Sequence, residues 1–201
     1  MKVILVRHGR TSWNEEGRLQ GWKGISLSER GISEVETLAG KLSDIRPEII
    51  YSSDLARAVQ TAETLMRLNS WKVPHKIDSR LREINHGLWE GRKVSEIPEL
   101  RDMETVEGFR PPGGESFRDV ATRVGGFMAE LKSSGHAEVL VVGHQVSNAV
   151  FSLLAMGFSP EHRVFGFLSA GMVSSLGLLA NTGKNLMSLV QANSEWEELT
   201  L

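Results

Sequence analysis

The sequence of 201 residues contains no cysteine. This absence excludes disulfide bonds, thiolate metal sites and a cysteine nucleophile. No apolar run comes close to the roughly 20 residues that a membrane-spanning helix needs. The first apolar stretch, "VILV", ends at Arg7 and is too short for the core of a signal peptide. We therefore expect a cytoplasmic protein that has no membrane partner.

The sequence also lacks an excess of charge of either sign, since the net charge is −2 and acidic and basic residues are interspersed. A basic surface for nucleic acid is therefore not expected. A chain of this length suits one domain, which can bury roughly 70% of the surface that the unfolded chain exposes. We predict a single domain over residues 1–201, as a monomer or a homodimer.

What the sequence does contain is an alternation of strand-like runs and helical patterns. This order predicts an α/β fold in three α/β/α layers, with a mostly parallel central sheet and helices on both faces. Strands are expected at 2–6, 48–53, 72–78 and 137–144, and a closing hairpin at 172–180 and 185–193. The strand at 72–78 is expected at an edge of the sheet because Pro74 cannot donate a hydrogen bond.

The helical patterns cover residues 26–44, 53–68, about 115–133 and 146–157. Ser28 is the expected N-cap of the first of these helices, and Ser53 or Asp54 that of the second. The segment at about 84–114 is rich in glycine, proline and charge, which predicts a loop-rich excursion with at most short helices. We expect this excursion to lie over the active site.

Two of the firmest strands end in histidine, since "VILVRH" ends at His8 and "VLVVGH" at His144. A third, "EIIYSSDLAR", delivers Arg57 one helical turn beyond its end. In open α/β sheets, ligands bind outside the carboxyl ends of the strands. If the three strands are parallel neighbours, Arg7 joins the two histidines and Arg57 at one point.

Two arginines and two histidines repel one another unless an anion lies between them. A dianionic phosphoryl group suits such a cluster because guanidinium groups match phosphate oxygens. Histidine can attack phosphorus as a nucleophile, and phosphoryl transfer depends mainly on positioning and charge stabilisation. An acid must also protonate the leaving oxygen, and Glu83 in "LREINHGLWEG" is the candidate.

Five motifs occur in a set order: "RHGRTSWN" with "LQGW", "SSDLARAVQTA", "LREINHGLWEG", "PGGES" and "VVGH". This series resembles the histidine phosphatase superfamily in its phosphoglycerate-mutase-like branch, and the alpha-ribazole or broad-specificity phosphatases within it. The resemblance covers about 150 residues. It implies a phosphoglycerate-mutase-like fold and a metal-independent phosphomonoester hydrolase, without a cofactor, that acts on a small-molecule phosphate ester.

The resemblance implies a role for each matching position. His8 would form the phosphohistidine, Glu83 would donate the proton, and His144 would stabilise the transition state. The residues expected to bind the phosphoryl group or to line the substrate pocket are Arg7, Arg57, Asn14, Gln20, Gly21, Trp22 and Gln145. Gln145 departs from the family, which often has glycine or serine there.

Three alternatives stay open at this point. A phosphoglycerate mutase would share the first half-reaction, although those mutases tend to be longer and to enclose their cofactor. A non-catalytic domain that binds a phosphorylated ligand would use the same fold. A metal site of His8, His144 and Glu83 is disfavoured because the flanking arginines would repel a divalent cation.

Overall fold

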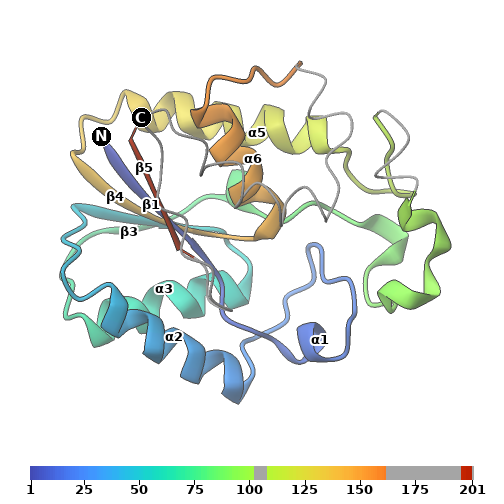
Figure 1. Ribbon diagram of the computed structural model, residues 1–201, viewed down its shortest axis with the longest axis horizontal. Helices are drawn as coiled ribbons and strands as arrows, with labels where there is room; N and C mark the ends of the chain where they lie inside the picture. The colour runs from blue at the N-terminus through green and yellow to red at the C-terminus, as the bar shows by residue number, and fades with distance from the viewer. Residues whose placement is uncertain (102–107, 162–195, 201) are drawn as a thin grey trace, which may run out of the picture.

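A computed structural model of the protein describes residues 1–101, 108–161 and 196–200 (Figure 1). Within these ranges, one sheet has the strand order β3-β2-β4-β1-β5. The strands are β1 (Lys2–Arg7), β2 (Ile49–Ser52), β3 (His75–Ile77), β4 (Glu138–Gly143) and β5 (Trp196–Thr200). β1 to β4 are parallel, and β5 pairs antiparallel with β1.

The four predicted strands are confirmed, and β3 lies at an edge of the sheet as expected. β2, β4 and β1 form the centre of the sheet, because β4 pairs with both β1 and β2. The expected hairpin at 172–180 and 185–193 lies outside the described residues.

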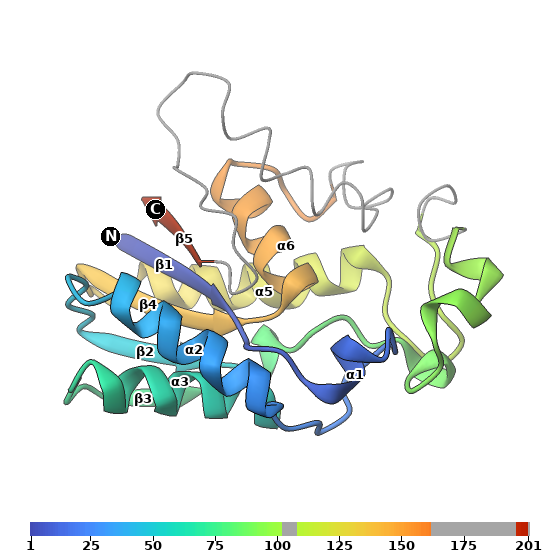
Figure 2. The same cartoon turned by 60° about the horizontal axis from the view of Figure 1, so that its bottom comes forward.

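Helices cover both faces of the sheet (Figures 1 and 2). α2 (Glu29–Lys41) and α3 (Ala56–Leu68) pack on one face, and α5 (Phe117–Lys132) and α6 (Gln145–Ala155) pack on the other. Side chains of β1 alternate between the two cores, because Val3 and Leu5 join one and Ile4 joins the other. The fold is therefore the three-layer α/β/α arrangement predicted from the sequence.

Of the two N-caps predicted from the sequence, one is confirmed and one is not. Ser28 caps α2 and accepts a hydrogen bond from the Gly31 amide, as predicted. The prediction of Ser53 or Asp54 as the cap of α3 was wrong, since the N-cap is Leu55, without a side-chain hydrogen bond. The reason is competition, because the Asp54 carboxylate is paired with the Arg82 guanidinium.

The carboxyl ends of the parallel strands face one end of the molecule (right in Figure 1). There lie α1 (Ser12–Glu15) and the first part of the excursion, which contains η2 (Gly87–Trp89), η3 (Val94–Glu96) and η4 (Pro98–Arg101). η1 (Ser79–Leu81) precedes this part. The excursion has only short helices within its described residues, as expected. The single domain over 1–201 stays a prediction.

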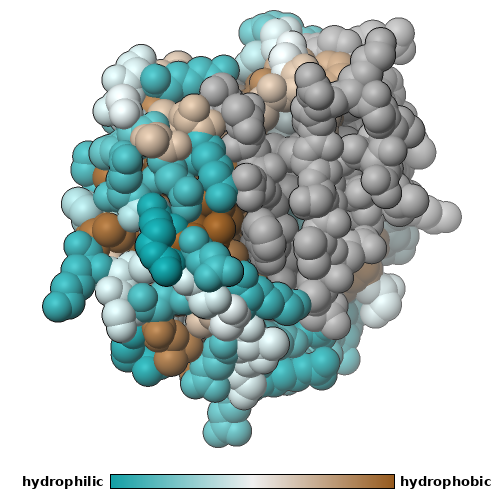
Figure 3. All heavy atoms as spheres, turned by 60° about the vertical axis from the view of Figure 1, so that its left-hand side comes forward, coloured by the Kyte–Doolittle hydropathy of each residue, from teal (hydrophilic) through white to brown (hydrophobic). Residues whose placement is uncertain are grey.

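Among the coloured residues on the face shown in Figure 3, most are hydrophilic, and the hydrophobic ones form small separate patches. In the described ranges, no helix has both the length and the apolar character that crossing a bilayer requires.

Candidate active site

The ends of β1 and β4 place two histidines side by side. Arg7 pairs with Gly143 in the parallel register, so that the next residues, His8 and His144, are neighbours. Their ring centroids are 4.9 Å apart, with 58° between the ring planes. His144 is fully buried and His8 is 6% exposed. The sheet topology thus brings together two residues that are far apart in the sequence.

Hydrogen bonds fix which nitrogen of His8 carries its proton. The Nδ1 atom lies 2.7 Å from the Gly9 carbonyl oxygen. A carbonyl only accepts, so Nδ1 holds the proton and Nε2 keeps a free electron pair. Nε2 accepts a hydrogen bond of 3.2 Å from the Arg57 Nε. The nitrogen that could attack phosphorus is therefore unprotonated and points at Arg57.

Arg57 is fully buried in the first turn of α3. Besides its bond to His8, its guanidinium donates to the carbonyl oxygens of Gly21 (2.8 Å) and Lys23 (2.9 Å). Burial lowers its pKa to about 10, which still leaves it charged at neutral pH. The protein therefore holds one permanent positive charge beside the His8 Nε2.

His144 lacks hydrogen-bond partners for both ring nitrogens among the described residues. Buried polar groups normally have partners, so a pair of orphaned nitrogens needs an explanation. Burial, followed by the charge of Arg57, holds the pKa of His144 well below its usual value. Burial and the same arginine do so for His8. Both rings are neutral at neutral pH, and an anionic ligand would supply the missing partner for His144.

Arg7 is half-buried at the end of β1. Its charge contributes to the low pKa of both histidines. Within the part of the chain that the structure describes, no carboxylate pairs with its guanidinium. The charges of Arg7 and Arg57 thus both act on the two histidines, and guanidinium groups in such a position favour a phosphoryl dianion.

Glu83 reaches the same site from the other side. Its carboxylate accepts hydrogen bonds from the amides of Val146 (3.0 Å), Gln145 (3.1 Å) and Ile84 (3.0 Å). The first two amides are at the N-terminus of α6, directly after His144. The carboxylate of Glu83 thus lies at the helix end that begins with the second histidine.

The family follows from the sequence and this geometry together. Residues 3–183 match the profile of the histidine phosphatase superfamily (branch 1). The chain belongs to this superfamily. The match covers most of the chain, including His8, Arg57, Glu83 and His144. The resemblance drawn from the five ordered motifs is confirmed.

Several members of the superfamily are similar to this chain. Phosphoserine phosphatase 1 of Hydrogenobacter thermophilus is 38% identical over 153 residues, which are 73% of this chain and 72% of that protein. A mycobacterial glucosyl-3-phosphoglycerate phosphatase, solved with VO3, is 29% identical with a TM-score of 0.74, covering 97% of this chain and 95% of that one. The alpha-ribazole phosphatase of Shigella flexneri is 27% identical with a TM-score of 0.71, covering 80% and 82%.

The loop that contains Gln20, Gly21 and Trp22 lies against the site. The Gly21 carbonyl holds Arg57, and the Trp22 indole N–H donates to the Glu83 carbonyl at 2.8 Å. One face of the Trp22 ring is covered by the Arg82 guanidinium, 4.6 Å from the ring centroid. Gln20 is buried, and its Oε1 has no partner among the described residues. Contacts of these residues with a substrate stay predictions.

The last two predicted pocket residues have structural bonds of their own. The Asn14 Oδ1 accepts from the amide and hydroxyl of Thr11 in a capping box at the start of α1. Gln145 contributes its amide to Glu83, and its side chain is half-buried. A contact of Asn14 with phosphate stays a prediction, and it requires the Nδ2 amide.

Sequence reasoning missed the residues that hold this site in place. Arg123 binds the backbone around Glu83, and Glu115 binds Arg123. Glu90, with a side chain 7% exposed, accepts from the Trp22 amide at 2.8 Å. Glu90 and Glu115 stand inside the motifs "LWEG" and "GGES". A charged residue amid glycines and aromatics was the available signal.

No set of three histidine, aspartate or glutamate side chains with the geometry of a metal site occurs in the described residues. The nearest candidates, His8, His144 and Glu83, share their surroundings with Arg7 and Arg57. Independence from metal and from other cofactors stays a prediction that activity measurements must decide.

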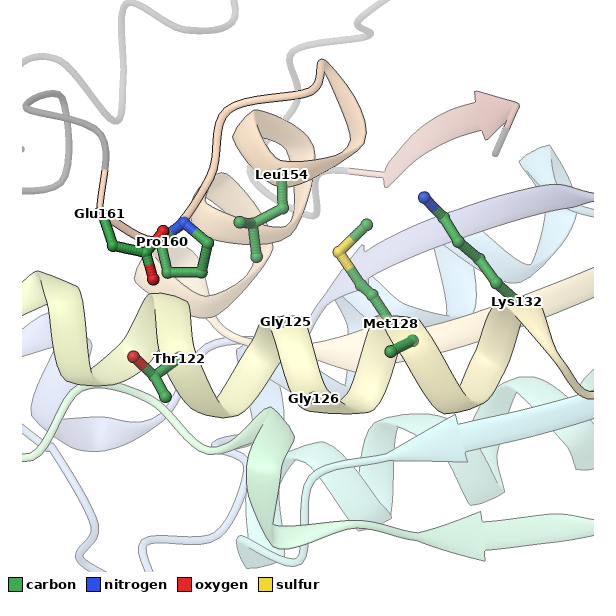
Figure 4. Close-up of a pocket in the computed structure, with 9 residues that line it drawn as sticks. Thr122, Gly125, Gly126, Met128, Lys132, Leu154, Pro160 and Glu161 are labelled. Atoms are coloured by element: carbon green, nitrogen blue, oxygen red, sulfur yellow. The ribbon is translucent and has the colours of Figure 1, made fainter.

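A separate hollow of about 380 Å³ lies between α5 and the end of α6 (Figure 4). Gly125 and Gly126 leave the space open on the α5 side, and Leu154 and Pro160 face it from the other. Among the described residues lining it there is no histidine or arginine. The hollow thus lacks the groups that mark the site at the strand ends.

Proposed function

We propose that this protein hydrolyses small-molecule phosphomonoesters through a phosphohistidine at His8. One observation carries the proposal: the His8 Nε2 keeps its electron pair beside the buried Arg57, next to His144, whose two ring nitrogens have no partner among the described residues. Phosphoryl transfer needs a nucleophile, a fixed positive charge and a group such as the His144 imidazole that can hydrogen-bond the phosphoryl oxygens.

In the first step, the His8 Nε2 attacks the phosphorus atom. The N–P bond forms as the bond between phosphorus and the ester oxygen breaks. Glu83 donates a proton to the leaving oxygen, and the product is an alcohol. Arg7, Arg57 and His144 bind the phosphoryl oxygens, whose charge they stabilise.

In the second step, water attacks the phosphorus atom of phosphohistidine. The Glu83 carboxylate takes a proton from that water, which restores the acid for the next cycle. The N–P bond breaks, inorganic phosphate leaves, and the electron pair returns to His8 Nε2. The same carboxyl thus serves as acid and then as base.

The proposed substrates are small phosphate monoesters. The names of similar proteins include phosphatases of phosphoserine, glucosyl-3-phosphoglycerate and alpha-ribazole phosphate. Support for a small ester comes from the buried position of both histidines. We further propose that the protein acts in the cytoplasm, without metal, as a monomer or homodimer.

The test is turnover of nitrophenyl phosphate with and without EDTA, together with acid-quenched labelling from a ³²P-labelled ester. We expect activity that EDTA leaves unchanged, vanadate inhibition and a label on His8. His8→Ala should lose both label and at least about a thousandfold in kcat. Loss of activity in EDTA would argue for a metal enzyme. Phosphate binding without turnover would favour a binding domain, and transfer to phosphoglycerate faster than to water would favour a mutase.

A further inference from the structure

The segment that carries Glu83 is neither a helix nor a strand. Residues 82–86 connect η1 to η2. Backbone carbonyls in such a segment have no partner of their own in regular secondary structure, so other parts of the fold must supply donors. The position of the Glu83 carboxyl depends on those donors.

Arg123, in the middle of α5, supplies them. Its guanidinium donates to the carbonyl oxygens of Arg80 (2.7 Å), Arg82 (2.7 Å) and Glu83 (3.0 Å). Its other two N–H groups donate to the two carboxylate oxygens of Glu115, at 2.9 and 3.1 Å. All five donors of one guanidinium are therefore used, and the side chain is only 15% exposed.

Glu115 holds the other side of Glu83. Its Oε2 accepts the Asn85 amide at 2.9 Å, and its own amide donates to the Asn85 carbonyl at 2.9 Å. The backbone approaches closely here, because a Cβ on Gly114 would overlap the Asn85 carbonyl oxygen. Arg123 and Glu115 thus grip the chain on both sides of Glu83.

We propose that Arg123, fixed by Glu115, is a positioning residue that sets the place of the Glu83 carboxyl for proton transfer. The inference rests on the proposed function. The Glu83 carbonyl bound by Arg123 belongs to the same residue as the carboxylate that meets the α6 amides, so a shift of one moves the other. Proton transfer tolerates little misplacement, and a shift near 1 Å can cost about a hundredfold in rate.

Arg123→Lys is the informative variant because it keeps the positive charge, which also acts on His144. A lysine ammonium has three donors at one point and cannot replace a planar fork with five. For phenyl phosphate, whose leaving group needs a proton, we expect kcat/KM to fall about 10- to 100-fold. For dinitrophenyl phosphate, whose leaving group needs none, we expect a change within about threefold.

A double variant shows whether Arg123 acts through Glu83. With Glu83→Gln the acid is already absent, so adding Arg123→Lys should slow phenyl phosphate by less than about threefold more. Multiplication of the two effects, or equal slowing of both esters by Arg123→Lys, would overturn the inference. If the wild type is active but the variants give either of these results, only this inference is overturned. If the wild type hydrolyses neither ester, the proposed function and the inference are both overturned.

Arg110→Lys is the matched control, because Arg110 forms an exposed pair with Asp119 and is not bound to residues 80–85. Circular dichroism should show that each variant is folded. If Arg123→Lys does not fold, Glu115→Gln serves as the test in its place, because it weakens the hydrogen bonds of Glu115 to the Arg123 guanidinium and to the Asn85 amide. We expect it to slow phenyl phosphate selectively, and an equal effect on both esters would overturn the inference.

Discussion

His8 and His144 have the same side chain and nearly the same burial, yet their hydrogen bonds differ. The Gly9 carbonyl fixes the proton of His8 on Nδ1, whereas the His144 ring has no partner among the described residues. This difference suits the proposed roles, in which the first ring attacks phosphorus and the second binds the phosphoryl group. Chemistry at this site depends on these few contacts.

Arg57→Lys should reduce kcat/KM by about a hundredfold and weaken vanadate inhibition. A lysine cannot contact the His8 Nε2 and the carbonyls of Gly21 and Lys23 in one plane, as the guanidinium does. Steady-state kinetics measure the effect. Arg67→Lys, at an exposed position of the same helix, is the control. Near wild-type activity in Arg57→Lys would count against its role in phosphate binding.

Glu83→Gln should slow esters with poor leaving groups about a hundredfold or more, and dinitrophenyl phosphate much less. The amide cannot donate a proton to the leaving oxygen, although it can still accept from the α6 amides through its oxygen. Rates across a series of aryl phosphates give the dependence on leaving group. A parallel loss for every ester would show that Glu83 is not the acid.

At the scale of the elements, the site is assembled from strand ends, one helix start and two loops. The loop at residues 20–23 contributes backbone oxygens rather than side chains to Arg57. Its shape requires Gly21, which has a φ of +49°, and a Cβ there would overlap the Glu90 carboxylate. A glycine and a buried acid therefore determine where Arg57 points.

Gly21→Ala should reduce kcat/KM by about tenfold or more and lower the free energy of unfolding by about 1 kcal/mol or more. The added methyl group would displace Glu90 and, with it, the carbonyls that hold Arg57. Kinetics and urea unfolding measure both effects. Gly24→Ala is the matched control, since a Cβ at Gly24 meets no atom within 4 Å. Equal behaviour of the two variants would refute the argument.

At the scale of the whole molecule, two apolar cores on opposite faces of the sheet fix the strands, and the strands fix the histidines. The cores contain the alternating residues of β1 and β4 together with the helices that cover them. Burial of His8 and His144 is a consequence of this architecture, because both follow directly on strands whose interiors are inaccessible to solvent. Because their pKa values are lowered by burial, the free energy of unfolding depends on pH.

The free energy of unfolding should decrease as the pH falls below about 6.5. His8 and His144 resist protonation in the folded protein because burial lowers their pKa, whereas the unfolded chain takes up protons near pH 6.5. The unfolded state then binds more protons, so stability is lost by up to about 1.4 kcal/mol per pH unit for each histidine. The smaller downward shifts of His75 and His86 act in the same direction.

Urea unfolding between pH 5 and 8 in phosphate-free buffer tests this expectation. His144→Asn should flatten the dependence below pH 6.5 because it removes one of the two buried histidines. A free energy of unfolding that stays constant from pH 8 to 5 would contradict the burial argument.

The sequence by itself determined the layered fold and which histidines lie together at the candidate site, because alternating burial and strand-end positions are local properties. "VILVRH" and "VLVVGH" each predict a buried strand ending in histidine without knowledge of the rest. Parallel pairing then brings the ends of the two strands together, and in the structure the ring centroids of His8 and His144 are 4.9 Å apart. The same reasoning failed at Ser53 and Asp54, where a partner distant in sequence, Arg82, takes the capping carboxylate.

Only the tertiary structure decided which nitrogen of His8 is free, what holds Arg57 and what positions Glu83. These outcomes depend on backbone carbonyls, which every residue carries and no sequence pattern distinguishes. In the sequence, Arg123 looks like any other arginine of a helix. Its role arises because α5 packs against residues 80–85. A contact between elements exists only once the elements are packed, and for that reason it cannot be read from either element alone.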